Sequence, residues 1–125
     1  MTHDPAVLHP EHYTVVFEND RVRVLEYLDH PGEGTSPHDH PDSVMCTLTS
    51  FDRRLAAGEH QVDVHLDSGS VRWLDAQRHA GLNIGTTDTH ALFVELKEPA
   101  PAGRPRGSSL GPVDLGAGDG TGAPH

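Results

Sequence analysis

The sequence predicts a single all-β domain followed by a tail of different composition. Short runs rich in β-branched and aromatic residues alternate with glycine and proline signals at intervals of about ten residues, which is typical of a β-sandwich or barrel. No window of about 11 residues carries a convincing helical stripe. The 125 residues are enough to bury one core but not two.

The predicted strands follow one another between clear turn signals. Asn19-Asp20 makes the first turn, and Pro31-Gly32 ends the second strand. Val62, Val64 and Leu66 alternate with polar residues, which places one face of their strand on a core and the other in water. Residues 52–57 and 75–80 are predicted to form at most single turns. The predicted strands are residues 13–17, 22–28, 44–49, 62–66, 70–74, 82–85 and 91–97.

Composition divides the chain into three segments. Residues 1–12 hold three His and two Pro without periodicity and are predicted to be an irregular arm. Residues 13–98 form the predicted β-domain. Residues 99–125 contain seven Gly, five Pro and no aromatic side chain, so they bury too little apolar surface to offset their ordering entropy. We expect this tail to be disordered and dispensable for the site described below.

Charge and cysteine content exclude some function classes. The formal net charge of -10 argues against a nucleic-acid or anionic-membrane partner, because both require a basic patch. A single cysteine, Cys46, excludes an internal disulfide, and no stretch reads as a signal peptide or a membrane span. The prediction is a cytoplasmic protein with a small-molecule ligand or substrate.

A histidine pattern is the strongest functional signal. His38 and His40 are two apart in an extended segment, so they project to the same face and can offer two imidazole nitrogens to one ion. With 11 His in the chain, roughly one such pair is expected by chance. Gly32 upstream and the later spacing from His79 to Asn83 favour a metal site, with His79 as the third ligand.

This combination resembles the two motifs of the cupin superfamily, G-x5-H-x-H followed by H-x3-N, over roughly residues 21–97. The resemblance implies a small single-domain cupin of the RmlC-like type. Its fold would be an antiparallel β-barrel, also called a double-stranded β-helix or jelly roll, which usually holds a divalent metal. The resemblance also implies a homodimer, in which the apolar residues 13–17 could add to a partner's sheet.

The sequence departs from the family pattern in its first motif. The glutamate expected four or five residues after the second His is replaced by Val44 and Met45. What survives is a neutral set of three His, for which Asp42 is the nearest carboxylate and His90 a further imidazole. Asn83 either holds a ligand in place or serves ordinary turn chemistry beside Gly81 and Gly85. These three residues are candidates for the surroundings of the metal: Asp42, Asn83 and His90.

Three functional classes stay open. A three-His cupin dioxygenase with Fe(II) is favoured, because it tolerates the missing glutamate. A metal-dependent lyase or isomerase would need a proton-transfer group, for which Glu95 and Tyr27 are the candidates, although Glu95 could equally pair with Arg23. The third class is a non-catalytic binding cupin. Three neutral imidazoles also suit Zn, Ni, Mn or Cu.

Overall fold

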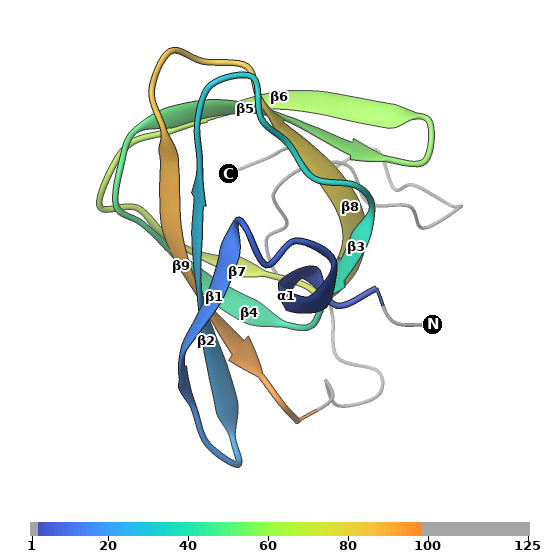
Figure 1. The fold of residues 1–125 in the computed structure, drawn as a ribbon, viewed down its shortest axis with the longest axis vertical. Helices are drawn as coiled ribbons and strands as arrows, with labels where there is room; N and C mark the ends of the chain where they lie inside the picture. The colour runs from blue at the N-terminus through green and yellow to red at the C-terminus, as the bar shows by residue number, and fades with distance from the viewer. Residues whose placement is uncertain (1–2, 99–125) are drawn as a thin grey trace.

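The computed structural model describes residues 3–98, and within them the chain forms two antiparallel sheets that face one another (Figure 1). The prediction of an all-β fold built from packed antiparallel sheets is confirmed. The first sheet, in the order β1-β2-β9-β4-β7, contains β1 (Tyr13–Glu18), β2 (Val22–Asp29), β4 (Ser43–Thr47), β7 (Val71–Leu74) and β9 (Thr89–Leu96). The second, in the order β3-β8-β5-β6, contains β3 (His38–His40), β5 (Phe51–Ala57), β6 (His60–Leu66) and β8 (Gln77–Asn83). The predicted tail, residues 99–125, lies outside the described residues.

The hydrophobic core lies between the two sheets. Buried side chains alternate with more exposed ones along the strands, so each sheet presents one apolar face to the other. Val64 and Leu66 are buried, as the alternation in the sequence predicts. The main cluster draws on both sheets and consists of Met45, Phe51, Leu55, Val64, Leu66, Leu74 and Ala91.

Two strands were not predicted from the sequence. Residues 52–57 and 75–80, for which the sequence allowed at most a single helical turn, lie largely in strands β5 and β8. The inward-facing residue at position 53 of β5 is a buried arginine. A prediction based on residue polarity would place this side chain in solvent. On β8 the positions that share the face of His79 are Gly81 and Asn83, so the strand lacks an apolar alternation.

Residues 3–12 of the N-terminal arm lie against the barrel and are not irregular throughout. Helix α1 (Pro5–Leu8) begins at Asp4, whose carboxylate accepts a 2.9 Å hydrogen bond from the backbone N–H of Ala6. The backbone carbonyl of His3 accepts a 2.8 Å hydrogen bond from the N–H of Asp39, on β3. The arm therefore lies against the strand that carries His38 and His40. No helix in residues 3–98 has the length and apolarity needed to cross a membrane.

Candidate metal centre

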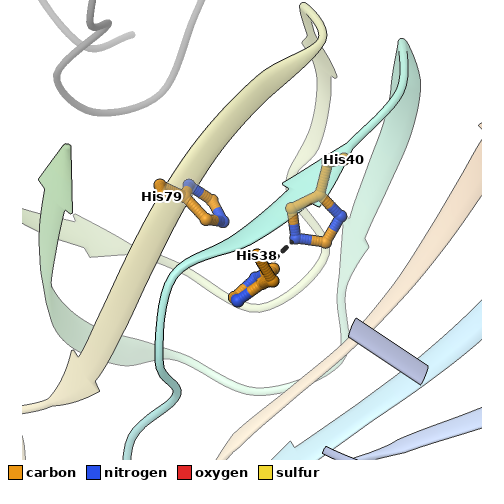
Figure 2. Close-up of side chains that lie close together, drawn as sticks. All are labelled: His38, His40 and His79. Carbon is orange, nitrogen blue, oxygen red and sulfur yellow. Dashed lines mark hydrogen bonds between the residues drawn. The ribbon is translucent and has the colours of Figure 1, made fainter. Parts of the chain in front are cut away.

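Strand pairing brings three histidines together. His38 on β3 is directly paired with His79 on β8, and His40 lies two residues further along β3 on the same face. Figure 2 shows the three rings turned toward one another. Asp39 and Arg78, paired between them, point the other way and form an exposed ion pair with 2.8 Å between Oδ1 and Nε. This outer contact lies in the same register that aligns His38 with His79.

The geometry of the rings fits a divalent metal. Their centroids are 4.7 Å apart for His38 and His40, 5.0 Å for His38 and His79, and 4.9 Å for His40 and His79, and each pair of planes meets at 77–81°. One nitrogen from each ring lies within 4.8 Å of the others. The Nε2 atoms of His38 and His40 are 2.9 Å apart. Two nitrogens bonded to one ion at usual metal–imidazole lengths would lie about 2.9 Å apart at an octahedral angle and about 3.3 Å apart at a tetrahedral one.

Burial keeps two of these imidazoles, His38 and His79, neutral. Burial, followed by the nearby His40, lowers the pKa of His38 to about 3. Burial, followed by His40 and His38, also holds the pKa of His79 well below its usual value. The buried Nδ1 of His79 has no hydrogen-bond partner among the described residues. At neutral pH His38 and His79 therefore offer uncharged nitrogen donors, the form that binds a metal.

Contacts behind the cluster orient two of the rings. The Nδ1–H of His38 donates to the carbonyl oxygen of Ser36 at 2.7 Å, which leaves the lone pair of Nε2 facing His40. The Nδ1 of His40 lies 3.4 Å from the carboxylate of Glu95. Carbonyl and carboxylate partners of this kind fix the tautomer and orientation of metal-binding histidines.

Glu95 belongs to a chain of charges that reaches the N-terminal arm. It is buried, and its Oε1 lies 2.7 Å from Nη2 of Arg23, whose Nη1 lies 2.8 Å from the carboxylate of Asp4. Both alternatives drawn from the sequence therefore hold in part, because Glu95 faces His40 and also pairs with Arg23. A role for Glu95 in proton transfer stays a prediction, and its carboxylate is already occupied by a guanidinium.

Tyr13 is the site residue that the sequence did not reveal. Its hydroxyl lies 3.4 Å from the Nε2 atoms of both His38 and His40. Burial raises the pKa of Tyr13 well above its usual value, so the phenol keeps its proton. No local spacing links Tyr13 to the histidine motif. The signal available was that it begins a predicted strand; in the structure it pairs directly with Tyr27.

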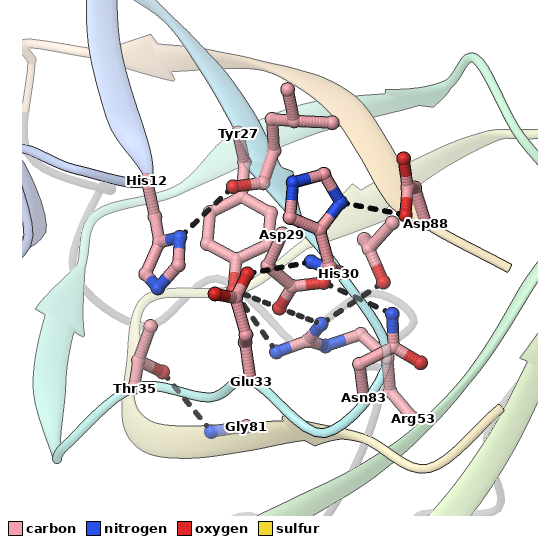
Figure 3. A network of polar contacts seen from close by, with 12 residues as sticks. His12, Tyr27, Asp29, His30, Glu33, Thr35, Arg53, Gly81, Asn83 and Asp88 are labelled. Atoms are coloured by element: carbon pink, nitrogen blue, oxygen red, sulfur yellow. Dashed lines mark hydrogen bonds and ion pairs between the residues drawn. The ribbon is translucent and has the colours of Figure 1, made fainter. Parts of the chain in front are cut away.

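Tyr27 and Asn83 belong to a separate polar network centred on Asp29 (Figure 3). The hydroxyl of Tyr27 donates to Asp29, and Nδ2 of Asn83 donates to the same carboxylate at 3.1 Å. Arg53 completes the network through a 2.6 Å contact from Nη1 to Asp29. Asn83 also accepts from the N–H of Gly85 at 3.0 Å, which is turn chemistry. The side chain of Asn83 therefore contacts the Asp29 network and its own turn.

The structure does not bring Asp42 or His90 into the histidine cluster. The carboxylate of Asp42 accepts a 2.9 Å hydrogen bond from the N–H of Ala76, which holds the connection between β7 and β8. His90 instead contacts Glu26 at 2.7 Å. Its two neighbours on β9, Thr89 and Ala91, are the buried residues, so the side chain of His90 points away from the core. The group of ligand atoms within 4.8 Å contains neither residue.

The cluster lies between an internal cavity and an outer groove. His38 and His79 border the cavity, which offers about 50 Å³ to the centres of water-sized molecules and is mostly apolar. His40 and Glu95 border the open groove, together with Arg23 and Lys97. A metal held by the three rings would therefore face a small, largely apolar chamber inside the barrel.

The two motif halves also meet through their backbones. Gly32 has a φ of +86°, a conformation that L side chains rarely adopt, and its N–H donates to the carbonyl of Asn83 at 2.9 Å. The N–H of Asn83 donates in return to the carbonyl of Glu33 at 2.9 Å. The glycine therefore turns the chain back onto β8, which sets the approach to His38.

Comparisons with solved structures agree with this fold. A cupin domain from Bordetella pertussis Tohama I is 28% identical, with a TM-score of 0.65 over 69% of this chain and 92% of that one. An RmlC-like cupin with a double-stranded β-helix fold from Methanocaldococcus jannaschii has 12% identity and a TM-score of 0.56, covering 67% and 77%. The polyketide cyclase RemF from Streptomyces resistomycificus has 18% identity and a TM-score of 0.52, covering 71% and 66%.

The fold and these likenesses define the class of the protein: the chain has the cupin, double-stranded β-helix fold, and it is similar at 28% identity to a cupin domain. No protein-family model matches the sequence, and no curated protein matches it. The three-His cluster in this fold supports a metal-binding cupin and a divalent metal as its cofactor.

Proposed function

We propose that the protein is a three-His cupin oxygenase that uses Fe(II) and dioxygen to oxidise a small organic molecule. The observation that carries the proposal is the donor set: the imidazoles of His38, His40 and His79 converge beside a small apolar cavity. Within residues 3–98, the group of candidate ligands contains no carboxylate. When bound, Fe(II) supplies the redox chemistry that a reaction with dioxygen needs.

The surrounding side chains have distinct tasks in this proposal. Ser36 and Glu95 orient the rings of His38 and His40 through their Nδ1 atoms. The apolar wall of the cavity excludes water from the substrate. Tyr13 keeps a proton on its hydroxyl oxygen beside the ligand nitrogens, where it can donate a hydrogen bond to an oxygen of the substrate.

Dioxygen consumption tests the oxygenase directly. Protein loaded with Fe(II) under nitrogen is mixed with air-saturated buffer and one of three small oxygen chelators: lactate, acetylacetone or catechol. We expect the wild type to consume dioxygen with at least one of them and to place isotopically labelled oxygen in the product. His79→Ala, treated in parallel, should show only the background rate of free iron. Equal rates for the two proteins with all three probes would reject the oxygenase.

A metal-dependent lyase or isomerase is the second candidate, and Tyr13 is the observation that favours it. Its hydroxyl is a proton-bearing group beside the cluster, whereas Tyr27 donates to Asp29 and Glu95 is paired with Arg23. The likeness to a polyketide cyclase supports the fold alone at 18% identity. Metal-dependent exchange of substrate protons with deuterated water, lost in Tyr13→Phe and unaffected by removing dioxygen, would favour this candidate.

We also propose that the protein is cytoplasmic, which agrees with its single cysteine. We further propose that it is a homodimer joined through β1. β1 is an edge strand of its sheet, and Val15, Val16 and Phe17 on it are 43%, 49% and 53% exposed. An apolar edge strand is a ready site for pairing with another chain. Sedimentation should give a dimer for the wild type and a monomer for Val16→Lys/Phe17→Lys. A wild type that sediments as a monomer at all accessible concentrations would contradict the dimer.

A further inference from the structure

The N-terminal arm, residues 3–12, reaches two of the three candidate ligands through a separate chain of contacts to each. Its helix α1 lies against β3, the strand that carries His38 and His40 (Figure 1). A metal ligand is held in place when the group behind its ring is itself held by a further contact. The arm supplies such further contacts for both histidines of β3.

The first chain of contacts runs from Asp4 to His40. Two parallel hydrogen bonds join the guanidinium of Arg23 to the carboxylate of Asp4, from Nη1 to Oδ2 at 2.8 Å and from Nη2 to Oδ1 at 3.0 Å. The same guanidinium donates from Nε to Oε1 of Glu95 at 2.9 Å. The other carboxylate oxygen of Glu95 lies 3.4 Å from Nδ1 of His40. Because a bidentate pair fixes the plane of the guanidinium, Asp4 determines where Glu95 stands beside His40.

The second chain of contacts runs from His9 to His38. The Nε2 atom of His9 accepts a 3.0 Å hydrogen bond from the backbone N–H of Ser36 and lies 2.8 Å from its hydroxyl. The carbonyl of Ser36 in turn accepts the 2.7 Å hydrogen bond from Nδ1 of His38. The rings of His9 and His38 also meet edge-on, with 6.1 Å between their centroids. The arm thus holds the residue that orients His38.

The first chain passes from the surface into the barrel. Side-chain exposure falls along it from 30% for Asp4 to 19% for Arg23 and 3% for Glu95. Asp4 can therefore be changed without removing an apolar side chain from the core. The third ligand gives a contrast, since the buried Nδ1 of His79 has no hydrogen-bond partner among the described residues. The contacts of the arm should thus set the positions of His38 and His40 relative to His79.

We propose that the arm is a positioning element of the metal centre, in which Asp4 orients His40 and His9 orients His38. This inference rests on the proposed metal site. The two chains hold the rings of β3 ready before the ion binds, so less ordering is left for the binding step. When either chain is broken, all three ligands remain but hold the ion more weakly.

The Co(II) affinity of the full-length protein tests this proposal, measured by competition with a chelator of known affinity. The visible spectrum of bound cobalt at saturation is the second readout, because it reports ligand geometry rather than stability. Asp4→Asn removes the charge but keeps a side chain that caps α1. It should weaken binding about three- to tenfold, less than the about 10–100-fold loss for a direct partner of a ligand, and should shift the spectrum.

Asp39→Asn is the matched control. It breaks an exposed ion pair with Arg78 on the strand that carries two of the ligands, but Asp39 points away from the cluster. This variant should bind Co(II) like the wild type and give the same spectrum. Affinities and spectra that are equal in Asp4→Asn and the wild type would overturn the role of Asp4.

A double variant shows whether the effect of Asp4 passes through Glu95. Glu95→Gln should weaken Co(II) binding about tenfold or more, because its carboxylate contacts a ligand directly. Adding Asp4→Asn to Glu95→Gln should then have little further effect, since residues that act in one chain are not additive. Losses that multiply in the double variant would contradict the chain of contacts.

His9→Phe tests the second chain, because it keeps a ring beside His38 but removes the acceptor nitrogen. It should weaken Co(II) binding to a similar extent, and its loss should multiply with that of Asp4→Asn, since the two chains share no residue. It also carries the test alone if Asp4→Asn does not fold, as judged by circular dichroism. A wild type that binds no Co(II) would refute the proposed metal site. A wild type that binds Co(II), with unaltered affinity in Asp4→Asn and His9→Phe, would refute this inference alone.

Discussion

Replacing His79 with alanine is expected to empty the metal site. Wild-type protein should hold close to one divalent ion per subunit, and His79→Ala or His40→Ala should hold at least about tenfold less, because two imidazoles compete poorly with water and buffer. Elemental analysis after dialysis against metal-free buffer measures the occupancy. Circular dichroism shows whether each variant keeps its sheet structure.

His65→Ala is the matched control for this experiment. His65 is also a strand histidine, but it is exposed on β6 and contacts Asp52 and Asp67 at 2.9 Å each. Hydrogen bonds to Asp67 and Asp52 raise its pKa, the opposite of the shift at His38. Its removal should leave the metal content unchanged. Equal occupancy in all three folded variants would mean that the motif match is an accident of a His-rich chain.

The gathering of the three histidines could be predicted because it follows from local rules. The same-face geometry of His38 and His40 needs only an extended backbone between them. The addition of His79 needed one long-range fact, its pairing with His38, which the resemblance to cupins supplied. The fold was predictable for a similar reason, since period-two alternation and turn signals are local patterns.

The surroundings of the cluster were predictable only in part, because they depend on pairings between distant residues. The pairing of Glu95 with Arg23 was one of two alternatives, whereas the place of Tyr13 was not predicted. Glu95 reaches Arg23 across 72 positions of sequence, and Tyr13 reaches His38 across 25. Each of these side chains also has an ordinary alternative role on a strand. Buried charged side chains are the hardest to recognise in a sequence. A charged residue is buried only when a partner pairs with it, and the sequence does not show that partner.

The buried pair of Asp29 and Arg53 gives the second large prediction. The side chains are 0% and 9% exposed, and Arg53 also donates to Thr89. Arg53→Met should lower the free energy of unfolding by about 3–5 kcal/mol, because it leaves the carboxylate of Asp29 buried without its cation. Urea unfolding followed by circular dichroism measures the change. A loss of this size is a large part of the stability of a small domain.

The neighbouring residue Arg54 provides the control for burial. It forms the same kind of pair with Asp63, at 2.8 Å, but the two side chains are 44% and 54% exposed. Arg54→Met should therefore cost no more than about 1 kcal/mol, since solvent screens an exposed pair. The double variant Asp29→Asn/Arg53→Met should recover part of the loss, because an amide is cheaper to bury without a cation than a carboxylate is. If Arg53→Met and Arg54→Met cost the same, burial is not what makes the Asp29 pair important. In that case the stability of the barrel would rest on its apolar clusters rather than on this ion pair.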